Sequence, residues 1–264
     1  MLFLHGFPEF WQAWHRQLAD FSNSFRAVAL DLRGYNLSGK PTDVASYELR
    51  RVAEDIRRVI HELSPGQKVV LVGHDWGGMV GWSLAREHPE LFDRLVIINA
   101  PHPLVFHREL KHSPAQMLSS FYAAFFQLRG VAEASLRAFD FAALRGMVFG
   151  MSAKPEAFTP ELRAAYRHAW GQAGALTGGL NYYRNVRALR SMAKEPPSWK
   201  IEVPTLVLWG ENDPALRLSN LAGLHEYVTT LSVRRHPRAT HWIVHEEPAW
   251  VNAAISEFVA GRDF

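Results

Sequence analysis

The chain has 264 residues, of which 48% are hydrophobic and 21% charged, so it can bury one large core and lacks the composition of a disordered protein. It contains no cysteine, which excludes disulfides, thiol catalysis and thiolate metal sites. The formal net charge is +3, but basic and acidic residues alternate rather than cluster, so we expect no nucleic acid partner.

The start of the chain, "MLFLHGFPEF", has neither the basic segment nor the length of a signal peptide. No apolar run reaches the roughly 18 residues that a membrane span needs. We therefore expect a soluble, cytoplasmic protein without a membrane span. In the helix-like stretch 47–63, Glu54 and Arg58 are four residues apart, which predicts an ion pair on a solvated outer face.

Short apolar, β-branched runs recur along the chain and are typical of buried parallel strands. They are residues 1–4, 26–31, 68–73, 94–99 and 204–210. Helical patterns separate these runs, and the clearest has on one face Leu49, Val52, Ala53, Ile56, Val59, Ile60 and Leu63. The alternation predicts an α/β fold with a mostly parallel sheet flanked by helices, and functional loops beyond the carboxyl ends of the strands.

The alternation stops between Pro103 and Lys200, where there are four valines and no isoleucine. Proline and glycine residues divide this stretch into several helices, and "KEPPSWKIEVP" returns the chain to the sheet. We therefore predict a core formed by residues 1–102 and 201–264, with a helical cap, residues 103–200, inserted over the strand ends.

"GHDWGG", residues 73–78, follows the third predicted strand and matches the strand–turn–helix pattern G-x-S-x-G, with Asp75 in place of the nucleophilic serine. The flanking glycines allow a sharp turn that exposes the middle side chain, and the following helix N-terminus stabilises negative charge there. Asp75 taken alone fits a helix N-cap equally well.

Two later sequence blocks supply partners for such a carboxylate. "WGENDPAL" places Asp213 beyond the fifth strand, and "THWIVHEEP" supplies His241. The order nucleophile, acid, base is that of α/β hydrolases, and a carboxylate behind an imidazole fixes its tautomer and stabilises the imidazolium. Glu211 and His245 are the nearest alternatives for the acid and the base.

"HGFP" follows the first strand. Gly6 permits a tight backbone there, so that the amide of Phe7 can point into the site. Together with the amide of Trp76 it predicts an oxyanion hole.

These blocks, in this order, resemble the epoxide hydrolases of the α/β-hydrolase superfamily over essentially the whole chain. "FYAAFFQLRGVAE" and "LNYYRN" resemble the family's cap blocks that carry two lid tyrosines, which fall on Tyr122 and Tyr183, with Tyr182 as the alternative in a shifted register. The chain departs from the family in two places. It begins at the strand leading to "HGFP", without the N-terminal hairpin, so either the sheet is shortened or the sequence is truncated, and Thr240 replaces a common glycine.

The resemblance implies that a vicinal diol is produced through a covalent ester on Asp75. Tyr122 and Tyr183 polarise the epoxide oxygen, and water activated by His241 and Asp213 hydrolyses the ester. No cofactor or metal is required. The expected substrate-binding residues are Phe7, Pro8, Trp76, Tyr122, Tyr183 and Trp242. An apolar or aromatic epoxide, a role in detoxification and a monomer or homodimer are expected.

The main alternative is a haloalkane or haloacetate dehalogenase, which uses the same aspartate ester, with the Trp76 indole binding the departing halide. Fluoroacetate dehalogenases place an arginine after the nucleophile, where this chain has Trp76. A halide leaves without a proton, so paired cap phenols favour epoxides. A further alternative is a hydrolase fold that serves as a non-catalytic ligand receptor.

Overall fold

The computed structural model describes residues 1–185 and 200–261. All five predicted strands are present as β1 (Leu2–Leu4), β2 (Val28–Leu30), β3 (Val69–His74), β4 (Phe92–Ile98) and β5 (Thr205–Gly210). A further strand, β6 (Leu231–His236), pairs with β5. In these residues the strands form a parallel six-stranded sheet of order β2-β1-β3-β4-β5-β6, which confirms the α/β-hydrolase architecture.

The register of the central strands brings the functional loops to one edge of the sheet. Leu4 pairs with Gly73, and His74 pairs with Ile98. The residues that follow β1, β3 and β4 therefore emerge side by side at the carboxyl ends of the strands, as parallel sheets require.

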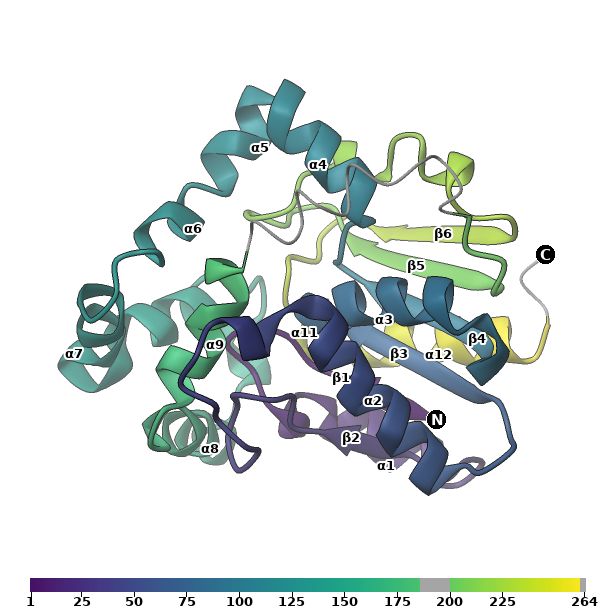
Figure 1. Cartoon of the computed structure of the whole chain (residues 1–264), viewed down its shortest axis with the longest axis horizontal. Coiled ribbons are helices and arrows are strands. Elements are labelled where there is room, and N and C mark those ends of the chain that lie inside the picture. Colours follow the sequence, from purple (N-terminus) through teal and green to yellow (C-terminus); the bar gives the residue numbers. More distant parts are fainter. Residues whose placement is uncertain (186–199, 262–264) are drawn as a thin grey trace.

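Helices cover both faces of the sheet (Figure 1). On one face lie α2 (Leu49–Leu63) and α3 (Trp76–Glu87), and on the other α1 (His15–Phe21) and α12 (Pro248–Val259). Shorter helical turns join the elements: η1 (Trp11–Trp14), η2 (Ala45–Tyr47), η3 (Pro89–Leu91), η6 (Leu218–Leu221), η7 (Leu224–Glu226) and α11 (Ile243–Glu246). No helix in the described ranges combines the length and apolar character needed to cross a membrane.

Between β4 and β5, all the regular elements of the described residues are helical. They are α4 (Pro103–His112), α5 (Pro114–Ser119), α6 (Tyr122–Phe125), α7 (Val131–Arg145), the π-helical turn η4 (Gly146–Gly150), η5 (Pro155–Ala157), α8 (Pro160–Gly171) and α9 (Ala175–Arg184). In Figure 1, α5 to α9 lie on the side to which the strand arrows point. Most of the predicted return segment "KEPPSWKIEVP" lies outside the described residues, and the cap boundaries stay a prediction.

The cap helices share one hydrophobic core with the sheet and with α2 and α3. Polar contacts add to this packing: the Trp170 indole donates a hydrogen bond to the carbonyl of Pro8 at 2.6 Å, and the Tyr182 hydroxyl donates to the carbonyl of Arg33 at 2.8 Å. The helices therefore hold their side chains at fixed positions over the strand ends.

Candidate active site

Asp75 occupies a sharp turn between β3 and α3. Its backbone has φ 50° and ψ −120°, in the left-handed region of φ that L residues rarely adopt. A Cβ at Gly77 would overlap the carbonyl of Leu4, so the turn can pack against β1 only with glycine there. The Asp75 side chain makes no N-capping hydrogen bond to α3. The turn thus presents the carboxylate outward, and the N-cap interpretation has no support.

The loop after β1 holds this carboxylate. The Phe7 amide donates a hydrogen bond to Oδ1 of Asp75 at 2.7 Å. A Cβ at Gly6 would overlap the same carboxylate, which explains the need for glycine beside Phe7. Burial raises the pKa of Asp75 above its ordinary value, although His241, His74 and then hydrogen bonds from the Phe7 and Trp76 amides work against the rise. The expected stabilisation of charge at this turn is therefore only partial.

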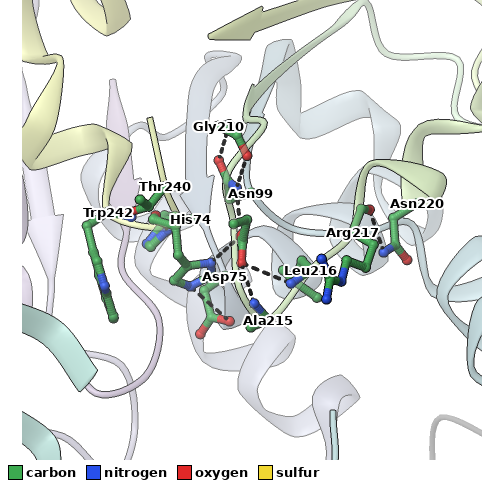
Figure 2. A network of polar contacts seen from close by, with 12 residues as sticks. His74, Asp75, Asn99, Gly210, Ala215, Leu216, Arg217, Asn220, Thr240 and Trp242 are labelled. Carbon is green, nitrogen blue, oxygen red and sulfur yellow. Dashed lines mark hydrogen bonds and ion pairs between the residues drawn. The ribbon is translucent and has the colours of Figure 1, made fainter. Parts of the chain in front are cut away.

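His241 and Asp213 form a tight pair at the ends of the last two strands. Nδ1 of His241 lies 2.6 Å from Oδ2 of Asp213. Asn99 donates to the same oxygen at 2.7 Å, while the amides of Ala215 and Leu216 donate to Oδ1 at 2.8 and 2.9 Å (Figure 2). Burial would raise the pKa of Asp213, but His241 and these donors hold it below its ordinary value. Asp213 therefore stays ionised behind the imidazole.

The other nitrogen of His241 faces Asp75. Nε2 lies 3.8 Å from Oδ2 of Asp75. Burial would lower the pKa of His241, but Asp213 and, to a smaller extent, Asp75 raise it to about 9. The resting imidazole is therefore protonated at neutral pH and sits between two carboxylates.

The alternative acid and base lie elsewhere. Nε2 of His245 is 2.8 Å from Oε1 of Glu9, and Glu211 pairs with Arg235 at 3.4 Å on the surface. The described contacts thus join His241 with Asp213 and Asp75, as the order of the sequence motifs predicts.

Beneath His241 lies a buried polar cluster that sequence analysis did not find. Glu9 bonds to His74 at 3.1 Å and accepts a hydrogen bond from the Tyr166 hydroxyl at 2.6 Å, and Nε2 of His74 contacts the carbonyl of His241 at 2.9 Å. Burial would raise the pKa of Glu9, but hydrogen bonds with His245 and His74 hold it well below its ordinary value. The cluster joins the "HGFP" loop, the nucleophile turn, the cap and the His241 loop.

Asp75 and His241 open into a cavity of about 190 Å³. It is lined by Phe7, Asp75, Ser119, Tyr122, Met147, Met151, Tyr183, Pro214, Ala215, Leu216, His241 and Trp242. Both expected lid phenols are among these residues, and their rings lie 5.8 Å apart, centroid to centroid. Burial raises the pKa of Tyr122 and of Tyr183 well above the ordinary value for a phenol, so both stay protonated.

Some expected substrate-binding residues do not reach this cavity. Pro8 and Trp76 are not among its lining residues. Trp76 instead packs edge-on against Tyr183 at 5.2 Å, and hydrogen bonding between their side chains partly offsets the rise in the pKa of Tyr183. Tyr182 also lies away from the cavity, because its hydroxyl bonds to the backbone of Arg33. The register that assigns the second lid phenol to Tyr183 therefore fits the geometry.

Ser119, Met147, Met151 and Leu216 line the cavity and were not expected. Ser119, Met147 and Met151 belong to no motif, and only the path of the cap brings them to the strand ends, whereas Leu216 ends the "WGENDPAL" block. Within the described ranges, no group of three or more His, Cys, Asp or Glu side chains is arranged to hold a metal ion.

Thr240, the departure from the usual glycine, makes its own contacts. Its hydroxyl donates to Oε1 of Glu246 at 2.6 Å and its amide donates to Oε2 at 2.7 Å. The same carboxylate accepts hydrogen bonds from Ser152 and from the amide of Ala153 in the cap. These hydrogen bonds therefore hold the loop that carries His241 in place at Thr240, the residue before it.

Known proteins resemble the chain over nearly its full length. A family model described as alpha/beta hydrolase fold matches residues 1–248. The AB hydrolase superfamily protein YfhM of Bacillus subtilis (strain 168) is 39% identical over 99% of this chain and 90% of that protein. Epoxide hydrolase 4 of Mus musculus is 37% identical over 98% of this chain and 72% of that protein.

A solved structure agrees with this likeness. The crystal structure of Bacillus megaterium epoxide hydrolase in complex with an inhibitor superposes with a TM-score of 0.91 at 39% identity, covering 98% of this chain and 93% of that one. A family match of this extent, with relatives at 39% and 37% identity that are covered over 90% and 72% of their length, establishes membership. The chain belongs to the epoxide hydrolases of the α/β-hydrolase superfamily.

Proposed function

We propose that the chain hydrolyses an epoxide to a vicinal diol through a covalent ester on Asp75. The observation that carries the proposal is one cavity that holds a carboxylate, an imidazole and two protonated phenols, namely Asp75, His241, Tyr122 and Tyr183. Relatives that are named epoxide hydrolases support the substrate class.

The first step opens the ring. Oδ1 of Asp75 is held by the Phe7 amide, so Oδ2 attacks a ring carbon, and the bond between that carbon and the ring oxygen breaks. The departing alkoxide is strongly basic and takes a proton from Tyr122 or Tyr183. Their raised pKa values mean that both phenols carry that proton at neutral pH.

The second step hydrolyses the ester. Alkylation removes the negative charge of Asp75, one of the groups that raise the pKa of His241, so that pKa falls and the imidazolium gives its proton, through solvent, to the phenolate left by ring opening. The neutral imidazole then accepts a proton from water. The hydroxide adds to the ester carbonyl carbon, Cγ of Asp75, while the Phe7 and Trp76 amides stabilise the oxyanion. The bond between Cγ and Oδ2 then breaks, and the diol leaves with Oδ2 after its alkoxide takes the proton of the imidazolium. The new carboxyl group returns a proton to His241. Asp213 stabilises the imidazolium that forms.

Contacts of Trp76 favour an epoxide over a haloalkane. The indole N–H is the only hydrogen-bond donor of a tryptophan side chain. The Trp76 ring packs against Tyr183 at 5.2 Å, and Trp76 is not among the residues that line the cavity. A leaving halide would therefore lack the donor that the dehalogenase hypothesis assigns to Trp76.

The cavity suits a compact apolar epoxide. Its volume of about 190 Å³ lies below the range of about 300–1,000 Å³ typical of sites for drug-sized ligands. Much of its wall is apolar, including Phe7, Met147, Met151, Leu216 and Trp242. A mutant of the Bacillus megaterium enzyme, in which an alanine replaces a phenylalanine, is complexed with its product (R)-3-[1]naphthyloxy-propane-1,2-diol. For this chain we propose epoxides with a smaller aryl or alkyl substituent.

Two measurements test the function. Diol and free halide are assayed separately with styrene oxide, an aliphatic epoxide, a haloalkane and fluoroacetate. We expect diol from the epoxides, and halide release as the main activity would support a dehalogenase. In a single turnover in heavy-oxygen water, the ester mechanism leaves the diol unlabelled, because its new oxygen comes from Asp75. A labelled diol would show direct attack by water.

A further inference from the structure

A second pocket lies on the cap, away from the catalytic cavity. Its volume is about 390 Å³, and it is lined by Ala142, Arg145, Gly146, Phe149, Gly150, Pro155, Arg163 and Arg167. These residues come from the end of α7, from the π-helical turn η4, from η5 and from α8, at the left of Figure 1. We call it the arginine pocket.

The arginine pocket carries an excess of positive charge. None of its lining residues is acidic. Asp140, beside the pocket, contacts Arg167 at 3.2 Å and Arg145 at 3.8 Å through the same Oδ2. One carboxylate therefore faces two guanidinium groups, which are always charged in proteins.

The third guanidinium is held by groups that bring no negative charge. Arg163 donates to the carbonyls of Phe158 and Pro155 at 2.8 and 2.7 Å, and it lies 5.1 Å from the ring centroid of Phe149. These hydrogen bonds fix the plane of the Arg163 guanidinium, but the carbonyls carry no negative charge to balance it. Arg145 meets Asp140 and, at 3.5 Å, the carbonyl of Phe139, while its buried Nε has no hydrogen-bond partner among the described residues.

The residues that line the arginine pocket determine which kind of ligand it can bind. Guanidinium groups bind carboxylates and phosphates through paired N–H donors. Phe149 and Pro155 add an apolar surface, and the volume lies within the range of small-molecule sites. We propose that the arginine pocket binds a small organic anion, with its carboxylate or phosphate toward Arg145 and Arg167 and its apolar part against Phe149.

The position of the pocket separates it from the catalytic site. The turn η4 forms a wall of both: Gly146, Phe149 and Gly150 line the arginine pocket, whereas Met147 faces the catalytic cavity. A ligand in the arginine pocket therefore does not touch Asp75 or His241, and its binding is measured independently of turnover.

Calorimetric titration of the whole chain with phenyl phosphate, benzoate and inorganic phosphate tests the proposal. We expect saturable binding of both organic anions, with phenyl phosphate tighter than inorganic phosphate. Arg145→Gln with Arg167→Gln should weaken binding about tenfold or more, since hydrogen bonds between charged groups are worth that much. Asp140→Asn should strengthen binding, because it removes the competing carboxylate.

The control is Arg129→Gln with Arg137→Gln, which removes the same charge from exposed positions of the cap. It should leave binding within about twofold, because charge at a distance is screened. Equal weakening by both pairs, or weaker binding in Asp140→Asn, would overturn the assignment. Equal affinity for phenyl phosphate and inorganic phosphate would overturn its apolar part.

Discussion

Nε2 of His241 lies 3.8 Å from Oδ2 of Asp75, so the charges of the proposed base and the proposed nucleophile interact in the resting protein. The pKa of His241, about 9, depends in part on that carboxylate. Neutralising residue 75 is therefore a way to imitate the alkylated state.

The first prediction concerns this coupling. Asp75→Asn removes the charge and should lower the pKa of His241 below 9, as measured by an NMR titration of the imidazole. In the unaltered chain, ester hydrolysis by the proposed mechanism needs neutral His241. The neutral fraction grows with pH, so the ester on Asp75 should accumulate more at low pH. An unchanged pKa in Asp75→Asn would show that the Asp75 carboxylate does not contribute to it.

A second prediction traps the intermediate. His241→Gln removes the base and leaves Asp75 and both phenols in place. The peptide that contains Asp75 should then gain the mass of the substrate, seen by mass spectrometry after acid quenching. Asp75→Asn combined with His241→Gln is the control and should gain nothing; a mass increase there would place the ester on another residue.

Removal of the lid phenols gives the third prediction. Tyr122→Phe with Tyr183→Phe should slow ring opening by about 10²- to 10⁴-fold, the usual contribution of a general acid, as measured in single-turnover kinetics. Tyr182→Phe is the matched control. It loses the hydrogen bond to the Arg33 carbonyl and should affect stability rather than ring opening.

The fourth prediction concerns the buried cluster under His241. Glu9→Gln should lower the free energy of unfolding by about 3 kcal/mol, because breaking a buried charged network leaves its partners unsatisfied. Glu211→Gln, which breaks a surface pair with Arg235, should cost less than about 1 kcal/mol. Denaturant unfolding measures both changes.

The loss of folding stability at low pH tests the same cluster around Glu9. The pKa of Glu9 is lower in the folded chain than in the unfolded one, so its stabilisation is present above the unfolded pKa and is lost as pH falls through the folded one. Glu9→Gln should therefore flatten the loss of stability below about pH 4.5. A parallel curve for the variant would mean that the folded chain does not depress that pKa.

Most of the sheet and the pair of His241 with Asp213 could be predicted from sequence. Buried strands have continuous apolar runs, and Asp213 and His241 lie within short motif blocks. Strand β6 was missed because it lies at an edge, where Ser232, Arg234 and Arg235 interrupt its apolar residues and its exposure alternates.

The polar cluster of Glu9 could not be predicted. Glu9, His74, Tyr166 and His245 come from four distant segments, and only the folded chain brings them together. Pro8 illustrates the opposite error, because it was expected to bind substrate. It adjoins Phe7 in the sequence, but its carbonyl accepts a hydrogen bond from the Trp170 indole, and Pro8 does not line the cavity.

The hydrogen bond from the Phe7 amide makes the two oxygens of Asp75 inequivalent. In the proposed mechanism Oδ1 remains anchored throughout the cycle, whereas the oxygen facing His241 leaves with each product molecule and is replaced from solvent. Over many cycles in isotopically enriched water, the side chain should therefore take up a single heavy atom. Only one carboxylate oxygen of the proposed nucleophile is exchanged, and Oδ1 remains the oxygen that was present when the chain was synthesised.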